Sequence, residues 1–493
     1  MKKNISLLLC IYLITASFSF AEPVTKETAR KVAFNKLQLS STTQNQTISK
    51  NTQYFSGKNG GVLFFLFELK PAGYIVVTAD TDLPPVIAYS TTANAVVPGK
   101  ENNELISMLV CDIELRLGNI AGLSSQILQQ RHEEWDFLVN GFKQRDKSFQ
   151  QWPPEGTTST GGWLGTNWTQ NVPYNNFCPM DPVTNQRSLA GCPAVAMAQV
   201  VNYYATINET KFTDEDDYYH SYSGRNYWID DDYQAIDFPS FPELNNYLDT
   251  LTASFVNQSP LKPGLKAALN FACGVAAKQV YTSGISGTFG VNQAFDAYMK
   301  FGFESAVLRD ENDTALYSVM ANNMMEARPV HLAVVDPAGT MGHNVVVDGY
   351  NTDDFYHLNF GWGGSYNGWY LLPYEIPYGL TVIEGAITDI GFPPINTRVG
   401  PSSNDWYLDV SLYPNPSCNK VHISVTLDKP SETGIDVLTN SGKKLYSFFT
   451  GHLSKGKHTF SVDLNQIPGI SPGFYICRLR AGQTNTCLKM IYK

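Results

Sequence analysis

The first third of the chain alternates between helix-like and strand-like spacing of hydrophobic residues. Ala29, Val32, Ala33 and Leu37 recur every three or four positions, which is typical of the buried face of a helix. Apolar runs rich in β-branched and aromatic residues follow, and a second helical pattern comes after them. The expected elements are a helix over residues 25–37, strands over 61–68 and 73–78, and a helix over 105–120. Residues 22–150 are therefore predicted to form a separate α+β domain.

A second block, residues 163–395, is the longest and most aromatic part of the chain. A helix is expected from Cys192 to Tyr204, and strands are expected at 330–335, 342–350 and 355–360. Between the two blocks, residues 151–162 are rich in Pro, Gly, Ser and Thr and offer few anchors. This composition predicts a linker that a protease cuts easily.

The last part of the chain has a strand pattern. Residues 396–407 form a second linker, and residues 408–493 contain alternating runs such as Val421–Leu427, with turn residues about every ten positions. This pattern predicts a small β-sandwich.

The N-terminus carries a targeting signal. A basic start is followed by a short apolar stretch and small residues before Glu22, which describes a secretory signal peptide over residues 1–21. A lipoprotein signal is the alternative, but Cys10 lies inside the apolar run and not at its end. No later segment approaches the ~20 consecutive apolar residues of a membrane helix, so we expect no transmembrane segment and a soluble, exported mature protein.

Composition narrows the possible partners. The 493 residues are 43% hydrophobic and 16% charged, with a formal net charge of −10, so nothing indicates disorder or a nucleic-acid partner. Eight cysteines are too sparse for a disulfide-stapled scaffold. Three of them lie in residues 160–395, so at least one thiol there stays free or pairs outside that block.

Cys192 is the candidate nucleophile. It precedes Pro193, which suits the first position of a helix, and it follows Gly191, which leaves the approach to the sulfur open. The positive end of the helix should favour thiolate over thiol and lower the pKa of Cys192. A buried structural cysteine beneath a core helix is the alternative.

A reactive thiolate needs an imidazole partner from a distant part of the chain. His343 opens an apolar strand behind Gly342, where its side chain can face a cleft. His331 and His357 fall inside strand-like runs and are expected to be structural. We therefore predict that His343 is the general base.

Three further residues complete the candidate site. Asn359 lies across a plausible hairpin from His343, and its carbonyl could accept from the imidazole and hold the tautomer. Trp362 could cover that hydrogen bond, and Gln170 could donate to the developing oxyanion together with the backbone N–H of Cys192. Hairpin packing and a surface glutamine are the alternatives for these positions.

Taken together, these motifs resemble the streptopain family of papain-like cysteine peptidases. The matching residues are Trp168, Gln170, Pro173, Tyr174, Asn175, Gly191, Cys192, Ala196, Ala198, Gln199, Gly342, His343, Asp348, Gly349, Asn359, Gly361, Trp362, Gly363 and Gly364. The resemblance implies an α+β fold of two subdomains, a helical part carrying Cys192 and a β-sheet part carrying His343. It also implies Cys192 as nucleophile, His343 as base and acid, Gln170 as oxyanion donor, and Asn359 with Trp362 as support for His343.

The flanking domains carry resemblances of their own. Residues 22–150, especially Gly73–Asp80 and Pro84–Ser90, resemble the inhibitory propeptide of that family, which implies a zymogen whose propeptide blocks or misaligns the cleft. Residues 408–493 resemble the C-terminal sorting domain of the type IX secretion pathway. The implied partners are protein or peptide substrates, the chain's own propeptide and the secretion machinery, and the implied location is the cell surface or the medium.

Other chemistries fit the sequence less well. Ser471 matches a serine-hydrolase elbow formally, but Pro472 removes a backbone N–H that the oxyanion hole needs. No zinc-site spacing occurs, so we expect no metal and no cofactor. A Cys-His amidase acting on peptidoglycan and a nonenzymatic surface binder on a peptidase-like fold remain alternatives to the endopeptidase.

Overall fold

The computed structural model of the chain describes residues 23–39, 46–95, 104–140, 149–310, 312–335, 342–372, 382–391, 408–413, 420–439, 444–470, 473–482 and 484–492. The predicted signal peptide at 1–21, the predicted linker at 396–407 and the formal serine elbow at Ser471 lie outside these residues. Contacts divide the chain into two compact units, residues 1–391 and 392–493. None of the helices in the described ranges is long and apolar enough to cross a bilayer.

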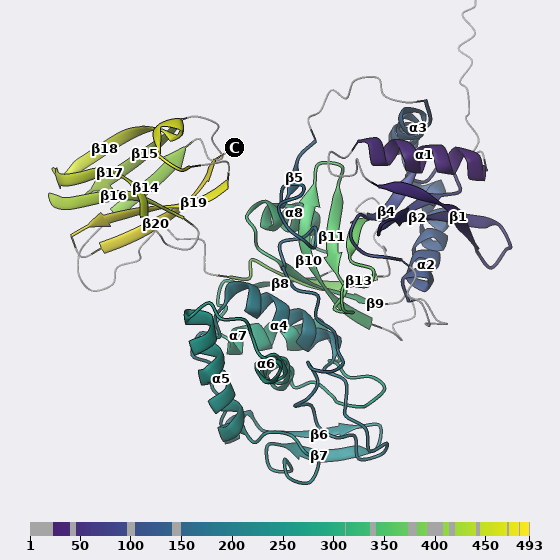
Figure 1. Cartoon of the computed structure of the whole chain (residues 1–493), viewed down its shortest axis with the longest axis horizontal. Coiled ribbons are helices and arrows are strands. Elements are labelled where there is room, and N and C mark those ends of the chain that lie inside the picture. The colour runs from purple at the N-terminus through teal and green to yellow at the C-terminus, as the bar shows by residue number, and fades with distance from the viewer. Residues whose placement is uncertain are drawn as a thin grey trace, which may run out of the picture. The chain divides into compact units, whose positions relative to one another are not determined.

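The first unit mixes helices with one large antiparallel sheet (Figure 1). Its helices are α1 (Lys26–Gln38), α2 (Glu104–Asn119), α3 (Ser125–Asn140), α4 (Cys192–Tyr204), α5 (Phe241–Val256), α6 (Pro263–Ala276), α7 (Val291–Lys300) and α8 (Leu316–Met325). The strands of the large sheet are β1 (Thr47–Ser56), β2 (Val62–Lys70), β3 (Tyr74–Thr78), β4 (Val86–Ser90), β5 (Gln151–Trp152), β8 (Val307–Asp310), β9 (Val330–Val335), β10 (Gly342–Asn351), β11 (Phe355–Asn359), β12 (Gly368–Leu371) and β13 (Val382–Thr388). A separate hairpin joins β6 (Tyr218–Tyr222) to β7 (Arg225–Ile229).

Local sequence explains the elements predicted near the N-terminus. Helix α1 begins after Thr25, whose hydroxyl caps the N–H of Thr28, and its buried residues are the four expected from the spacing. The strands expected at 61–68 and 73–78 are β2 and β3, and the helix expected at 105–120 is α2. These predictions are confirmed.

The large sheet runs through both predicted blocks of the first unit. Its strand order is β1-β2-β3-β4-β12-β11-β10-β9-β13-β8, and β5 pairs with the end of β10. At the junction Tyr89 in β4 lies opposite Trp369 in β12, and Ala88 lies opposite Tyr370. The N-terminal strands therefore extend the sheet that carries the candidate base, a continuity that the sequence did not predict.

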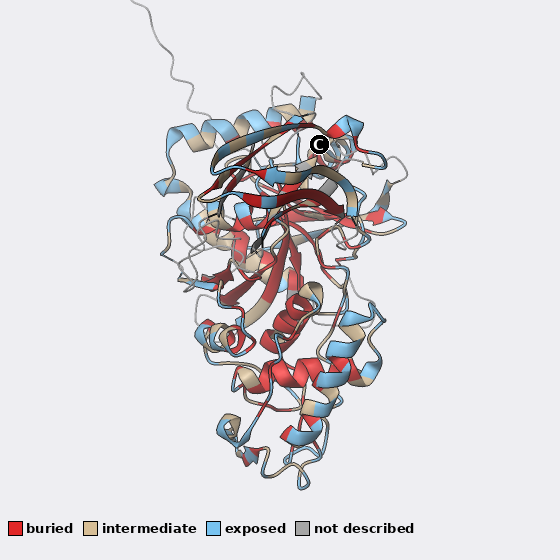
Figure 2. Ribbon diagram, turned by 90° about the vertical axis from the view of Figure 1, so that its left-hand side faces the viewer, coloured by how far each residue is buried: buried red, intermediate tan, exposed pale blue. Residues whose placement is uncertain are grey.

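Three hydrophobic cores lie around this sheet; two of them border β10, and the third packs α1 and α3 against strands that include β2 and β3. The first is built mainly from α4, α5, α6 and α7, and it reaches Val346 on β10. The second joins α2 and α8 to the other side of the strands, with Val345 and Val347 of β10. Figure 2 shows buried residues along the strands and on the helix surfaces that face them. Because β10 lies between the two cores, its position relative to α4 is fixed by packing on both faces.

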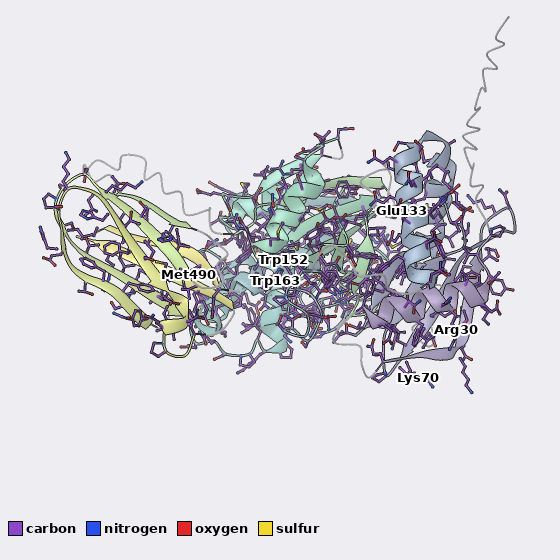
Figure 3. All side chains as sticks on the ribbon, turned by 90° about the horizontal axis from the view of Figure 1, so that it is seen from above. Arg30, Lys70, Glu133, Trp152, Trp163 and Met490 are labelled. Atoms are coloured by element: carbon purple, nitrogen blue, oxygen red, sulfur yellow. The ribbon has the colours of Figure 1, made fainter. Side chains whose placement is uncertain are left out.

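The segment predicted to be a loosely anchored linker is held more firmly than its composition indicates. Gln151 and Trp152 pair with β10, and the buried Asp348 accepts hydrogen bonds from the backbone N–H groups of Trp163 and Leu164. Trp152 and Trp163, which are labelled in Figure 3, thus lie at the two ends of this segment. Both are hydrogen-bonded to strand β10. The exposed residues between them are Pro154, Gly156, Thr157 and Ser159.

A buried hydrogen bond supports that attachment. Asp348 Oδ1 lies 2.6 Å from Nδ1 of His357, and both side chains are at most 1% exposed. Gly162 packs against the Asp348 carboxylate, where a Cβ atom would lie 2.1 Å from Oδ2. His357 therefore has the structural role that its place in a strand predicted.

The second unit is a two-sheet sandwich, as predicted. Its strands are β14 (Leu408–Tyr413), β15 (Lys420–Leu427), β16 (Ser431–Thr439), β17 (Lys444–Leu453), β18 (Gly456–Asp463), β19 (Gly473–Ala481) and β20 (Thr484–Tyr492). One sheet has the order β14-β15-β18 and the other β17-β16-β19-β20. Alternate residues of both sheets, including Ile423, Val425, Val437 and Leu479, form the core between them.

Candidate active site

Cys192 lies at the first position of α4, where the sequence placed it. Gly191 precedes the helix with φ of +84°, a backbone conformation that favours glycine, and Pro193 occupies the first turn. Cys192 is half-buried, whereas Cys178 and Cys273 are fully buried thiols. Of the three thiols in the described part of residues 160–391, Cys192 is thus the accessible one.

The pKa of Cys192 is raised in this structure, whereas the sequence predicted that it is lowered. Burial raises the pKa of the Cys192 thiol above its ordinary value, while hydrogen bonds from the backbone and side chain of Asn344, and from its own backbone, act to lower it. Desolvation of the anion thus outweighs the donors at the helix N-terminus. In the full-length chain we therefore expect Cys192 to be protonated at neutral pH.

Strand β10 brings His343 to the same place. Asn344, the next residue, directs its Nδ2 to within 3.8 Å of the Cys192 sulfur, and its backbone N–H also lowers the pKa of the thiol. The peptide that joins His343 to Asn344 therefore passes beside the sulfur. Cys192 and Asn344, which are 152 positions apart in sequence, meet where α4 packs on β10.

The imidazole of His343 has a different support from the one expected. Its Nε2 donates to the backbone carbonyl of Phe360 at 2.8 Å. Because a carbonyl only accepts, this bond places the proton on Nε2 and makes Nδ1 the basic nitrogen of a neutral ring. The carbonyl of Phe360 thus fixes the tautomer of His343, which is the role that the sequence assigned to Asn359.

The side chain of Asn359 is used elsewhere. Its Oδ1 accepts from the N–H of Gly361 at 3.1 Å and from Nε2 of Gln199 at 3.3 Å, and its Nδ2 donates to the carbonyl of Thr166 at 2.9 Å. The predicted bond from His343 to Asn359 is therefore replaced by the bond to Phe360. The physical reason is that Asn359 is 1% exposed and turned toward Gln199 of α4, where each buried amide satisfies the other.

Trp362 lies against His343, as the sequence predicted. Its ring stacks on the imidazole of His343 with centroids 4.2 Å apart, and on Phe360 at 5.3 Å. Tyr366 packs edge-on against Trp362, with ring centroids 5.6 Å apart. The indole thus limits rotation of His343 and covers one face of its ring.

Gln170 is bonded through its backbone to the loop that precedes Cys192. Its carbonyl accepts from the N–H of Ala190, two residues before Cys192, at 2.9 Å. The neighbouring Trp168 is buried and its carbonyl accepts from Gly363, so one segment contacts both the loop before α4 and the turn that carries Trp362. The Gln170 side chain is half-buried, and the backbone of Gln170 is held against the loop before α4.

Sequence reasoning assigned no role to three polar residues that build this site. Gln199, fully buried two turns along α4 from Cys192, accepts from Thr166 and Trp168 and donates to Asn359. Gln279 donates to the carbonyl of Ala190, directly before Gly191. Asn344 contacts the sulfur. The available signal was a polar residue inside an otherwise apolar run, as at Gln199 and Asn344.

Gly191→Ala should disturb the site strongly. A Cβ atom at this position would lie 2.6 Å from Oε1 of the buried Gln279, and the positive φ disfavours any side chain. The two effects together predict a loss of about 2–4 kcal/mol in the free energy of unfolding, with reduced activity because Cys192 shifts. Urea unfolding and peptide hydrolysis measure this. Gly165→Ala is the control, since nothing lies within 4 Å of its added Cβ, and equal behaviour of the two variants would contradict the prediction.

Three family models match the chain. Residues 168–370 match the Peptidase C10 family, residues 21–112 match the Spi protease inhibitor, and residues 411–493 match the secretion system C-terminal sorting domain. The last match indicates secretion across the outer membrane.

Curated proteins and solved structures are similar as well. The thiol protease/hemagglutinin PrtT of Porphyromonas gingivalis is 26% identical over 394 residues, which are 73% of this chain and 39% of that protein. Streptopain of Streptococcus pyogenes is 23% identical over 350 residues, which are 67% of this chain and 79% of that protein. A prointerpain A fragment from Prevotella intermedia is 20% identical with a TM-score of 0.47, covering 70% of this chain and all of the fragment.

Proposed function

We propose that this chain, whose residues 168–370 match the Peptidase C10 (streptopain) family, is a secreted cysteine endopeptidase in which Cys192 attacks peptide bonds and His343 transfers the protons. The observation that carries the proposal is the meeting of the α4 N-terminus with β10, which puts the backbone of His343 and Asn344 beside the Cys192 sulfur. A papain-like division into a helical part with Cys192 and a sheet part with His343 accords with the two cores that border β10.

The chemistry follows from the groups present. Nδ1 of His343 takes the proton of the Cys192 thiol, and the sulfur anion adds to the carbonyl carbon of the substrate peptide. The backbone N–H of Cys192 and the side-chain amide of Gln170 donate to the oxyanion. The C–N bond then breaks as His343 protonates the leaving amine, which leaves an acyl group on sulfur. Water deprotonated by His343 hydrolyses this thioester and restores the thiol.

The domain boundaries are part of the proposal. We assign residues 1–21 to a signal peptide, 22–150 to the inhibitory propeptide, 163–395 to the peptidase and 408–493 to the sorting domain, with linkers at 151–162 and 396–407. The three family matches fall inside these limits apart from one residue at position 21. Protein substrates and the secretion machinery are the proposed partners.

A direct test uses the purified full-length chain. Under reducing conditions the chain should shorten by loss of the propeptide and then hydrolyse casein, and a thiol-directed epoxide should block both steps and add its mass to Cys192. Intact-mass spectrometry and casein digestion follow the two events. Digestion of muropeptides without casein would favour the amidase, and absence of both activities with no labelling of Cys192 would favour a binding protein.

The propeptide contacts aromatic residues that pack against the neighbours of His343. Tyr74 on β3 is fully buried and donates to the carbonyl of Tyr366, and its hydroxyl also meets that of Tyr370. Tyr370 packs against Phe360 and Tyr366 against Trp362, the two residues that contact the imidazole. We propose that this contact contributes to latency by tightening propeptide binding over the site.

Tyr74→Phe should therefore speed maturation. The variant keeps the ring but loses hydrogen bonds worth about 1 kcal/mol across the propeptide–peptidase contact, which corresponds to about fivefold weaker inhibition. A time course of propeptide loss by intact mass should show a comparably shorter half-time. Tyr54→Phe, at a tyrosine that is 66% exposed on β1, is the control. A Tyr74→Phe precursor that loses its propeptide at the wild-type rate would contradict the proposed contribution of Tyr74 to latency.

A further inference from the structure

Asn344 is a polar residue in an apolar strand, and its side chain reaches the reacting atom of the proposed nucleophile. The residues that follow it, Val345 to Val347, are all buried. Its Nδ2 lies 3.8 Å from the sulfur of Cys192, within hydrogen-bond distance for a sulfur acceptor. An amide can present either its NH₂ group or its oxygen to a neighbour, so the contact stabilises an anion only if something fixes which end faces the sulfur.

His331 on the neighbouring strand β9 fixes that orientation. In the β9–β10 register Asn344 lies opposite Ala333, and His331 lies two residues further on β9, so the two side chains are diagonal neighbours on one face of the sheet. Nε2 of His331 is 2.7 Å from Oδ1 of Asn344, and Nδ1 is 3.3 Å from the hydroxyl of Tyr298 on α7. His331 and Tyr298 are fully buried.

The position of the Asn344 amide oxygen sets the direction of hydrogen bonding through these groups. Burial lowers the pKa of His331 to about 4, against the opposing effect of the bond to Asn344, so the ring is neutral at higher pH and carries a single N–H. Burial raises the pKa of Tyr298 well above its usual range, so its hydroxyl keeps the proton and donates to Nδ1. Oδ1 of Asn344 faces His331 and only accepts, so Nε2–H donates to it and Nδ1 accepts from the Tyr298 hydroxyl. The NH₂ group of the amide then faces Cys192.

We propose that Asn344 is a further catalytic residue, which donates a hydrogen bond to the Cys192 thiolate, and that His331 and Tyr298 are positioning residues that hold its amide in the donating orientation. The inference rests on the proposed function for its catalytic meaning. It assigns to His331 a task distinct from that of His343, because His331 moves no proton to or from the substrate. The side-chain donor acts in addition to the backbone N–H groups of Asn344 and Cys192.

The effect should appear in the ionisation of the thiol. Among the described residues, the titratable groups that face this arrangement are His343 on β10, His331 on β9 and Tyr298 on α7, with Cys273 of α6 and Tyr204 of α4 close to Tyr298. Burial lowers the pKa of His331 and raises the pKa of Tyr298, Cys273 and Tyr204, so these four groups keep fixed protonation states near neutral pH. Loss of the Asn344 donor should therefore raise the pH midpoint of Cys192 alkylation by about half a unit to one unit. The measurement is the iodoacetamide reaction rate at Cys192 against pH, read by peptide mass on the full-length chain.

Two substitutions at the same site separate an electrostatic role from a structural one. Asn344→Ala removes the donor, and Asn344→Asp keeps the shape while presenting a carboxylate oxygen to the sulfur. We expect the midpoint to rise in both, and to rise further in Asn344→Asp because like charges repel. Asn246→Ala, at an exposed asparagine of α5, should leave the midpoint unchanged. A midpoint equal to the wild-type value in Asn344→Asp, with or without the same result in Asn344→Ala, would overturn the proposal.

The role of His331 has its own test. His331→Leu removes the donor that fixes the Asn344 amide and should give part of the Asn344→Ala shift, whereas His331→Gln retains an N–H donor and should restore much of the wild-type midpoint. An equal midpoint in all three proteins would remove His331 from the proposal. Alkylation needs no proteolysis, so a chain that fails to cleave casein but shows these shifts would reject the endopeptidase and keep the hydrogen bond.

Discussion

Cys192→Ala is expected to yield a folded precursor that neither shortens itself nor hydrolyses casein. The substitution removes the sulfur that forms the acyl intermediate, so the expected loss in turnover is about 10⁴-fold or more. The fold should persist because alanine is a good helix former and Cys192 is a half-buried residue at the helix end. Intact mass, casein digestion and thermal unfolding of the purified chain measure the three parts of this prediction.

The outcomes of that experiment separate self-processing from catalysis. A Cys192→Ala chain that shortens normally but lacks casein hydrolysis would show that another protease removes the propeptide. A Cys192→Ala chain that still hydrolyses casein would reject Cys192 as the nucleophile. Cys178→Ala is the matched control, because this buried thiol lies in the core and not beside β10; it should lower the unfolding temperature and leave self-processing intact.

Elements fixed by local chemistry could be predicted from the sequence. Helix α1 illustrates this, because a capping threonine and four apolar residues at helical spacing act within one segment. The start of α4 is similar, since Gly191 and Pro193 set the helix boundary at Cys192 without help from distant residues. The alternating strands of residues 408–493 also carry their own signal for a sandwich.

The partners of the site residues could not be predicted in the same way. Strand β11 pairs with β10 so that Asn359 lies opposite Val346, with a register irregularity between Val347 and Gly349. This pairing directs Asn359 toward α4 and leaves the carbonyl of Phe360 for the imidazole of His343. A backbone carbonyl has no sequence signature, and a shift of one residue in register would exchange the two sides.

Composition alone could not predict how the segment before the peptidase is anchored. Its glycines and hydroxyl residues predicted a loose linker, yet the small side chains are what allow close approach to the buried Asp348–His357 pair. Glycine is thus compatible with both a flexible tether and a tight backbone contact, and only the position of Asp348 decides between them. The joining of β4 to β12 is likewise set by distant pairing, which no local pattern encodes.

His343→Ala is expected to abolish hydrolysis while leaving a reactive thiol. Without the imidazole no group takes the proton of Cys192 and returns it to the leaving amine, so turnover should fall by about 10³-fold or more. The donors from Asn344 and the helix end remain, and Cys192 should therefore still react with iodoacetamide when the pH is raised. Casein digestion and Cys192 alkylation on the same sample measure both effects.

The design of that experiment must separate loss of catalysis from failure to mature. His343→Ala should be treated with active wild-type enzyme, which is then blocked by the epoxide, so that the variant is tested with its propeptide removed. His452→Ala, at an exposed histidine of the sorting unit, should behave as wild type throughout. A processed His343→Ala chain that cleaves casein within tenfold of the wild-type rate would exclude His343 as the base. The imidazole beside Trp362 would then be a packing group, and the proton acceptor would have to lie elsewhere around Cys192.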